Sequence, residues 1–368
     1  IDDIRKFKKK YPNKKIIVTG CASQIDSKTF LNMSEVDHVI GNQEKMEFET
    51  FLKISNEKIT NKISDIMELK TIAPQFIESF ENHSRAFIQI QNGCDHRCTF
   101  CTIPYGRGNS RSLPINNIIE QIKMLNEKGF NEIILTGVDL TSYGPDLDEK
   151  VNLGKLVEAI LKNNKELKRL RLSSLDSIEI DSLLFEILSS EKRVMPHFHL
   201  SMQSGDNMIL KRMKRRHQRK DAINFCNKIK LARPEVIFGA DLIAGFPTET
   251  EGMFHNTLKI IDECDLTLLH IFPFSPMEKA PASKMPQVPK NIIKERAKIL
   301  REKGQLKMKD KFKDTVGKTL NVLTEKNSFG YSENYLKVKI SSKNSLKEGQ
   351  IIPAQITGYN PNHLEATI

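Results

Sequence analysis

Between residues 85 and 288, short apolar runs alternate with longer segments that have the spacing of amphipathic helices. Strands that alternate with helices are typical of a parallel sheet with helices packed outside it. Six such units predict an open or closed α/β barrel, with its reactive groups at the C-terminal ends of the strands. The predicted strands are 87–91, 132–136, 169–173, 197–202, 236–243 and 266–272, and the predicted helices are 118–127, 153–161, 182–189, 220–231 and 251–262.

Two flanking regions differ from this pattern. Near the N-terminus, one or two αβ units are expected, with a strand at 15–19 that runs into Gly20 and Cys21. The last region holds short β-type runs separated by glycines, which predict a small five-stranded barrel of the oligonucleotide-binding type. The sequence therefore predicts a partial N-terminal domain (1–55), a linker (56–84), the α/β barrel (85–288), a basic connecting helix (289–313) and a β-barrel (314–368).

The composition fits a globular chain. It has 368 residues, of which 39% are hydrophobic and 28% charged, enough for two or three domains with buried cores. Intrinsic disorder is excluded, and no apolar run approaches the roughly 18 residues of a membrane span, so no membrane partner is expected. The first residue is Ile1 and not Met, so we expect an N-terminally truncated fragment whose missing start would hide any targeting peptide.

The net charge of +11 is unevenly distributed. Residues 207–220 carry seven basic and no acidic side chains, and residues 289–313 carry ten basic and three acidic ones. Cations without counter-charges repel one another unless a polyanion neutralises them, so the first run predicts contact with nucleic acid. For 289–313, a solvated helix face explains the charge equally well. The predicted RNA-binding residues are Lys211, Arg212, Lys214, Arg215 and Arg216.

Three of the six cysteines lie within eight residues, as Cys94, Cys98 and Cys101. The pattern does not suit a disulfide framework, so a reducing, cytosolic setting is expected. Three thiolates in one loop can hold three irons of a [4Fe–4S] cluster and leave the fourth iron open for a chelating ligand. A zinc site completed by His96, or purely structural cysteines, is the alternative. Zinc sites usually pair two C-x2-C elements, and the sequence has no second pair.

Other cysteines and histidines have simpler interpretations. Cys226 and Cys264 have apolar neighbours in helical stretches and are predicted to be buried packing residues. His197 and His199 share one face of a strand, where core packing or substrate contact is favoured over a metal role.

Over nearly its whole length the chain resembles the radical S-adenosylmethionine (SAM) methylthiotransferase family. Its C-terminal segment resembles the TRAM domain of that family, which binds RNA. The matching motifs are IQNGC at 90–94, TIPYGRG at 102–108, SRS at 110–112, HLSMQSG at 199–205, KRM at 211–213 and DLIAGFPTE at 241–249.

The resemblance implies two cofactors, SAM and iron–sulfur clusters. SAM would chelate the open iron of the cluster on Cys94, Cys98 and Cys101, and its reductive cleavage would give a 5′-deoxyadenosyl radical that abstracts hydrogen. An electron donor such as flavodoxin or ferredoxin would supply the electron. A second [4Fe–4S] cluster would provide sulfur, and VTGCASQ at 18–24 resembles the last of its three ligand sites, which makes Cys21 a ligand. The other two sites have no counterpart in this chain.

The same resemblance implies a set of SAM contacts at strand ends. Glycines there would let the ligand approach the backbone closely. The alternative is that these residues only form ordinary turns at the strand ends. The implied SAM-binding residues are Thr136, Gly137, Ser173, Gln203, Ile243 and Gly245.

LRLSSLDS at 170–177 and VDHVIGN at 36–42 resemble the threonylcarbamoyladenosine branch of the family, the MtaB type. This branch implies a cytoplasmic enzyme that methylthiolates C2 of N6-threonylcarbamoyladenosine at position 37 in the anticodon stem-loop of tRNA. Methylthiolation of N6-isopentenyladenosine 37 or of a ribosomal protein aspartate stays open. A further interpretation, that the chain is an inactive RNA-binding iron–sulfur protein, stays open as well.

Overall fold

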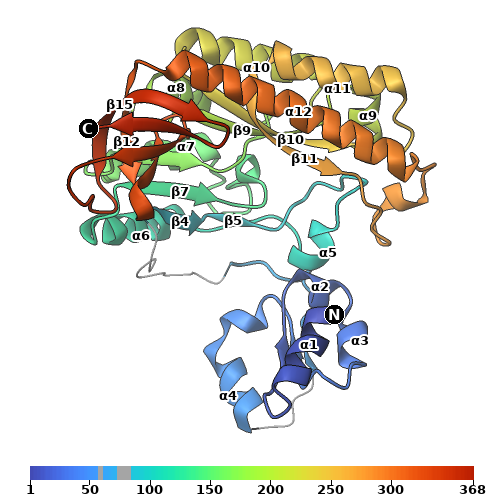
Figure 1. Cartoon of the computed structure of the whole chain (residues 1–368). Coiled ribbons are helices and arrows are strands. Elements are labelled where there is room, and N and C mark those ends of the chain that lie inside the picture. The colour runs from blue at the N-terminus through green and yellow to red at the C-terminus, as the bar shows by residue number, and fades with distance from the viewer. Residues whose placement is uncertain (57–60, 73–83) are drawn as a thin grey trace.

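A computed structural model describes residues 1–56, 61–72 and 84–368. Its centre is an open barrel of six parallel strands (Figure 1), built from two three-stranded sheets. Bridges from Leu170 to Val194 and from Leu175 to Leu200 join the two sheets. The strand order is β4 (Ala86–Gln89), β7 (Glu132–Thr136), β8 (Arg169–Leu172), β9 (His197–Gln203), β10 (Ile237–Ala244) and β11 (Leu266–Pro273). The six predicted strands are confirmed, with end points that shift by a few residues at most.

Helices that connect the strands pack on the outside of this barrel. Their apolar faces and the strands share one core, to which Ile118, Leu156 and Ile260 each contribute a fully buried side chain. Asn152, Asp181 and Thr250 cap three of the helices by accepting a backbone N–H of the first turn. The outer helices are α6 (Ile115–Glu127), α7 (Leu153–Asn163), α8 (Ser182–Ser190), α10 (Arg219–Ala232) and α11 (Glu251–Glu263).

Short elements at the C-terminal edge of the barrel were not predicted. They are β5 (Gln91–Asn92), α5 (Ile103–Arg107), β6 (Arg111–Ser112), α9 (Asn207–Arg212) and the 3₁₀ helices η2 (Leu140–Ser142) and η3 (Pro281–Lys284). α9 lies within the basic run, and Asp206 caps it by accepting the N–H groups of Met208 and Ile209. These elements frame the site.

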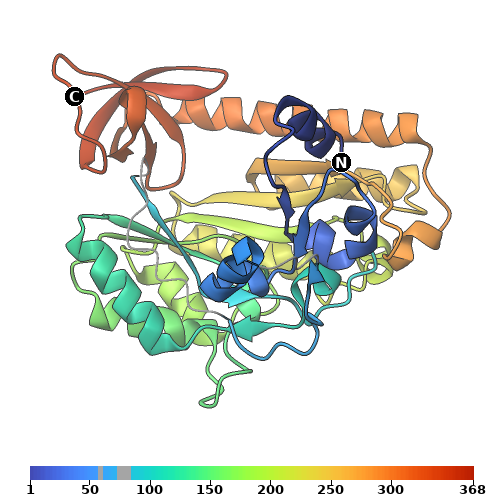
Figure 2. The same ribbon diagram turned by 90° about the horizontal axis from the view of Figure 1, so that it is seen from below.

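The N-terminal region is a small parallel sheet in the order β1-β2-β3 with short helices around it. Figure 2 views the molecule from the side on which this region lies, in blue. Of the predicted linker, residues 57–60 and 73–83 lie outside the described residues, and β3 falls in the remainder. The elements are α1 (Asp2–Lys10), β1 (Ile17–Val18), α2 (Cys21–Ile25), α3 (Ser27–Leu31), β2 (His38–Ile40), η1 (Glu44–Met46), α4 (Phe48–Asn56) and β3 (Asn61–Lys62).

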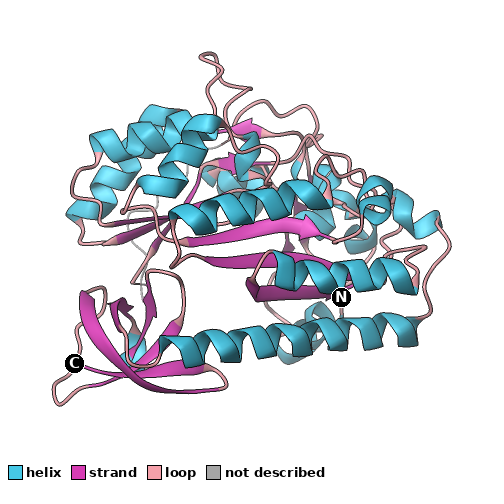
Figure 3. Cartoon of the chain, turned by 90° about the horizontal axis from the view of Figure 1, so that it is seen from above, coloured by secondary structure: helices cyan, strands magenta, loops and turns pink. Residues whose placement is uncertain are grey.

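At the other end, the helix α12 (Lys290–Thr315) runs straight along the barrel to a small closed β-barrel (Figure 3). The expected architecture, a partial α/β barrel followed by a small β-barrel, is confirmed. No helix in the described segments is long and apolar enough to cross a membrane. The β-barrel consists of β12 (Thr319–Thr324), β13 (Phe329–Ser332), β14 (Lys337–Ser341), β15 (Ile351–Asn360) and β16 (His363–Thr367), with the 3₁₀ turn η4 (Lys326–Ser328).

A buried ion cluster fastens the β-barrel to the α/β barrel. Glu132, on β7, is fully buried and accepts hydrogen bonds from Arg169 and Arg171 of β8. The two guanidinium groups also donate to backbone carbonyls of the β-barrel, at Asn321, Tyr331, Ser332 and Glu333. Three charges on two neighbouring strands therefore hold the two barrels together.

Candidate metal centre

The three clustered cysteines lie in the loop between β5 and α5, and the loop begins at a glycine that cannot be replaced without strain. Gly93 has φ +76°, and a Cβ there would lie 1.9 Å from the carbonyl oxygen of Asn109. The N–H of Cys94 donates to the Gly108 carbonyl at 3.0 Å, so the loop folds back on the segment that follows it. Cys94 and Cys98 are buried and Cys101 is partly buried.

Thr99 anchors the middle of this loop to the basic run. Its N–H donates to the carbonyl of Met213 at 3.1 Å, and its hydroxyl donates to the carbonyl of Arg212 at 2.8 Å. Its own carbonyl accepts from the N–H of Ala282 at 2.9 Å. The sulfur positions are therefore fixed by backbone contacts from two distant segments.

Arg215 lies inside the site, although the sequence predicts it at an RNA phosphate. Its side chain is 9% exposed and forms an ion pair with Asp176 at 2.7 Å. It also donates to the Ser201 carbonyl at 2.8 Å and lies 3.8 Å from the sulfur of Cys98. The guanidinium therefore places a positive charge beside the cysteine loop.

Two of the three thiols, those of Cys94 and Cys101, lie in an environment that disfavours negative charge. Burial raises the pKa of Cys94 to about 12, and the negative charge of Asp139 acts in the same direction. Burial and the charge of Cys98 likewise raise the pKa of Cys101. Because metal ions deprotonate thiols that bind them, Cys94 and Cys101 can still act as ligands of an iron–sulfur cluster, together with the adjacent Cys98.

The zinc alternative needs His96 as a ligand, and His96 has other partners. Its Nε2 lies 2.8 Å from Asp139 and 3.3 Å from Glu179. Hydrogen bonds to these two carboxylates raise the pKa of His96 to about 9, so a metal at this nitrogen would have to displace a proton as well as both contacts. The structure therefore favours the three-thiol set over the zinc site.

Sequence reasoning missed the carboxylates Asp139, Asp176 and Glu179. Each follows the end of a barrel strand, at which a polar residue is a signal for a site. The Asp139 carboxylate lies 3.9 Å from the sulfur of Cys94, which leaves a negative charge beside the cysteine loop. The Asp139 N–H in turn donates to the buried Gln91 side chain at 2.9 Å.

The residues that the resemblance assigns to SAM lie at strand ends. Thr136 and Ser173 line one cavity inside the barrel, and a Cβ on Gly137 would lie 3.0 Å from the side-chain oxygen of Gln91. Gln203 ends β9 at φ +65°, an unusual backbone conformation for a residue other than glycine and one that often marks a functional position.

Ile243 and Gly245 also have clear structural roles. Ile243 is buried among Phe246, Phe274 and Phe100 of the cysteine loop. Gly245 has φ +72°, and a Cβ there would lie 2.5 Å from the Ile293 side chain of α12. Packing alone thus requires a glycine at 245, whatever ligand approaches it.

Cys21 begins α2, which lies against α5 (Figure 1). A Cβ on Gly106 would lie 3.0 Å from the Cβ of Cys21. The Asn42 amide donates to the Gly106 carbonyl at 2.6 Å and lies 3.7 Å from the Cys21 sulfur. The two regions that carry cysteine motifs are therefore packed against each other.

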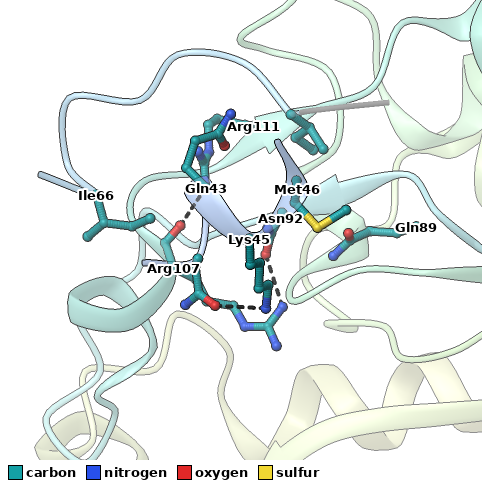
Figure 4. Close-up of a pocket in the computed structure, with 10 residues that line it drawn as sticks. Gln43, Lys45, Met46, Ile66, Gln89, Asn92, Arg107 and Arg111 are labelled. Atoms are coloured by element: carbon teal, nitrogen blue, oxygen red, sulfur yellow. Dashed lines mark hydrogen bonds between the residues drawn. The ribbon is translucent and has the colours of Figure 1, made fainter. Parts of the chain in front are cut away.

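A polar cleft between these two regions was not predicted (Figure 4). Arg111 donates to the carbonyl of Arg107 at 2.6 Å, and Arg107 donates to Asn92 at 3.3 Å. Lys45 donates to Asn42 at 2.9 Å on the other wall. None of the ten described residues that line the cleft is acidic, so it presents three cations.

The other predicted RNA-binding residues have different environments. Lys211, Lys214 and Arg216 are exposed, whereas Arg212 is partly buried and donates to the Thr248 hydroxyl at 2.8 Å. Arg216 forms an ion pair with Glu179. Of the five predicted RNA-binding residues, Lys211 and Lys214 are thus the two that face solvent without a carboxylate partner among the described ion pairs.

Comparison with known proteins gives a consistent result. The radical SAM superfamily model matches residues 88–261. Threonylcarbamoyladenosine tRNA methylthiotransferase MtaB of Rickettsia prowazekii (strain Madrid E) is 51% identical over 365 residues, which cover 99% of this chain and 86% of the relative. A tRNA-2-methylthio-N(6)-dimethylallyladenosine synthase of Clostridium novyi (strain NT) is 31% identical, over 88% of this chain and 73% of the relative.

The fold has a counterpart among solved structures. The radical SAM methyltransferase TsrM from Kitasatospora setae superposes with a TM-score of 0.58 at 12% identity, over 77% of this chain and 59% of that chain. At this identity the similarity concerns the fold alone, and it matches the partial barrel.

Proposed function

The chain belongs to the threonylcarbamoyladenosine tRNA methylthiotransferase family, and from this premise we propose that it methylthiolates C2 of N6-threonylcarbamoyladenosine at position 37 of tRNA. It is a radical SAM methylthiotransferase that uses SAM and a [4Fe–4S] cluster. The observation that carries the proposal is the buried loop of Cys94, Cys98 and Cys101 at the C-terminal edge of the barrel, with Cys21 packed beside it.

The cofactors supply a radical that removes hydrogen from an unactivated C–H bond, and the protein contributes binding and orientation. Cys94, Cys98 and Cys101 would hold the cluster, and the Asp139 carboxylate, 3.9 Å from the sulfur of Cys94, would accept the ammonium group of SAM. Thr136, Gly137, Ser173, Gln203, Ile243 and Gly245 would line the rest of the SAM site. Cys21 would be a ligand of the second cluster, close to where the first one acts.

The substrate would bind through its anticodon stem-loop. Lys211 and Lys214, which are exposed, would contact phosphates, and adenosine 37 would leave its stack to enter the barrel. The small β-barrel, which we interpret as a TRAM domain, adds an aromatic and basic face, since Lys337 lies 4.6 Å from the ring centre of Phe329. A donor such as flavodoxin or ferredoxin would provide electrons, and the enzyme would work in the cytoplasm, where tRNA is.

Mass spectrometry of digested tRNA nucleosides tests the reaction. The sample is a host that lacks its own enzyme, complemented with the full-length gene or with its Cys98→Ala variant as a control. We expect methylthiolated threonylcarbamoyladenosine with the first and none with the second. Methylthiolated isopentenyladenosine would refute the branch, and no methylthiolated nucleoside would refute the tRNA reaction.

A second experiment tests the RNA contact. Lys211→Glu with Lys214→Glu should weaken tRNA binding and lower the slope of log K against log salt by about one unit for each lost phosphate contact. Lys298→Glu, on the exposed face of α12, is the matched control, because its side chain is 75% exposed and already pairs with Glu302. Equal salt slopes for the two variants would refute a phosphate contact at Lys211 and Lys214.

A further inference from the structure

Three side chains of types that can bind metal ions lie close together inside the barrel, outside the cysteine loop. His199, Asp241 and His270 come from the neighbouring strands β9, β10 and β11. Nε2 of His199 lies 2.9 Å from Oδ1 of Asp241, and Nδ1 of His270 lies 3.2 Å from the same oxygen. The three candidate ligand atoms all lie within 4.8 Å of one another.

These separations fit the ligands of a single ion. Zinc and similar metals bind imidazole nitrogen and carboxylate oxygen at about 2.1 Å, so two ligands at right angles around the ion lie about 3 Å apart. The observed 2.9 and 3.2 Å fall close to this value. Two histidines and one carboxylate form a set that binds first-row divalent metals and leaves coordination positions open.

The three side chains differ in their exposure to solvent. The side chain of His199 is 9% exposed, that of Asp241 is 26% exposed and that of His270 is 64% exposed. They line a cavity of about 330 Å³ that Thr136 and Ser173 also line. An ion held here would be fixed from the barrel side, with its free positions directed toward the cavity.

Two nearby features support a ligand at this position. The residue beside His199 on β10 is Gly239, and a Cβ there would lie 2.6 Å from Nδ1 of His199, so the sequence leaves room for this ring. His197 also lines the cavity, is 9% exposed, and has an Nε2 atom without a hydrogen-bond partner among the described residues. Buried polar atoms are normally paired, so an unpaired one that lines the cavity points to a ligand there.

We propose that His199, Asp241 and His270 bind one first-row divalent cation, separate from the iron–sulfur clusters, and that its open positions accept an oxygen ligand such as a carboxylate. The cation would lie in the cavity that holds Thr136 and Ser173, residues proposed to contact SAM. The metal site itself follows from the three side chains and does not depend on the proposed tRNA reaction.

Anaerobic cobalt titration tests the proposal on the full chain with Cys94, Cys98 and Cys101 replaced by Ala, which removes the three ligands in the cysteine loop. We expect about one Co²⁺ per chain after chelator treatment, with the visible absorption of a protein-bound ion. His270→Ala and Asp241→Asn should each weaken Co²⁺ binding at least tenfold. His255→Ala is the matched control, because this exposed histidine on α11 pairs only with groups of Glu251 among the described residues.

Two outcomes would overturn the proposal: no stoichiometric Co²⁺ binding to the triple-alanine variant, or binding that His270→Ala and Asp241→Asn leave unchanged. If the triple-alanine variant does not fold, metal analysis of the reconstituted wild type and of His270→Ala decides the same question. The wild type should then hold one added divalent ion per chain beyond its iron–sulfur iron, and His270→Ala should lose it. Neither readout involves tRNA, so failure here and failure of the proposed reaction remain distinguishable.

Discussion

Replacement of Glu132 by Gln should loosen the attachment of the β-barrel and destabilise the whole chain. Glu132 is 0% exposed and accepts hydrogen bonds at 2.8 and 3.3 Å from Arg171 and at 3.4 Å from Arg169. The two guanidinium groups, each 3% exposed, share this single carboxylate. Glu132→Gln preserves the shape of the side chain but leaves two buried cations without an anion.

The expected loss of unfolding free energy is about 3–5 kcal/mol, the cost of removing one partner of a buried ion pair. Each 1.36 kcal/mol is a factor of ten, so the unfolding constant should rise by about 10² to 10⁴. Backbone carbonyls of the β-barrel, such as those of Ser332 and Asn321, accept hydrogen bonds from the arginines. They reduce the loss of unfolding free energy only in part, because they carry no full charge. The β-barrel should therefore separate first.

Urea unfolding of the cluster-free chain, followed by circular dichroism, measures this loss. The control is Glu158→Gln on α7, whose carboxylate is 52% exposed and lies 3.9 Å from Lys155. Surface pairs of this kind contribute about 0–1 kcal/mol. Limited proteolysis should cut between α12 and β12 earlier in Glu132→Gln than in the control. A loss within about 1 kcal/mol of the control, with equal proteolysis, would refute the reasoning.

Two further predictions concern the cysteine loop and pH. Gly93→Ala should abolish cluster assembly, because the new Cβ would collide with the backbone of Asn109. Gly129→Ala is the control, because Gly129 also has a positive φ but no atom lies within 4 Å of its Cβ position. Iron analysis should find about four irons per chain in Gly129→Ala and none in Gly93→Ala. Burial raises the pKa of Glu249 to about 7, against the lowering effect of Arg296. Because this lies above the unfolded value of 4.5, the unfolded chain loses its proton first, and the free energy of unfolding should fall as pH rises from about 4.5 to about 7 and then level off. Urea melts across this range should show that slope in the wild type and lack it in Glu249→Gln, and a slope that persists in the variant would contradict the assignment.

Regular elements were predictable where one pattern of burial dominates. The strand predicted at 132–136 is β7. A short apolar run is typical of a strand with both faces buried, and the structure buries both faces of this strand. α9 was missed because its basic residues were interpreted only as an RNA-binding run, and the side chain of Asp206 that caps it is a local signal just before that run. The fold class was therefore predictable, and the short elements around the site were not.

The site was predictable only in part, for a similar reason. The spacing of Cys94, Cys98 and Cys101 lies within one loop and can be read directly. Asp139 and Asp176 come from different strand ends, and only the folded barrel brings the first to Cys94 and the second to Arg215, which lies beside Cys98. The orientation of Arg215 was beyond the sequence as well, because it depends on a backbone reversal at Lys214, whose φ is +58°. Convergence of distant segments is a property of the tertiary structure.

The basic run at 207–220 has two roles, although the sequence suggests only RNA binding: some of its residues hold the cysteine loop, and others face solvent. Arg215 turns inward to Asp176 and Cys98, and the carbonyl of Arg212 accepts the hydroxyl of Thr99 in the cysteine loop. Lys211 and Lys214 lie next to these residues in the chain and face solvent. RNA phosphates bound there would be fixed relative to the cluster loop through one short, hydrogen-bonded segment. Because misplacement of a reacting group by about 1 Å costs about a hundredfold in rate, such a rigid link suits radical chemistry at a single base atom.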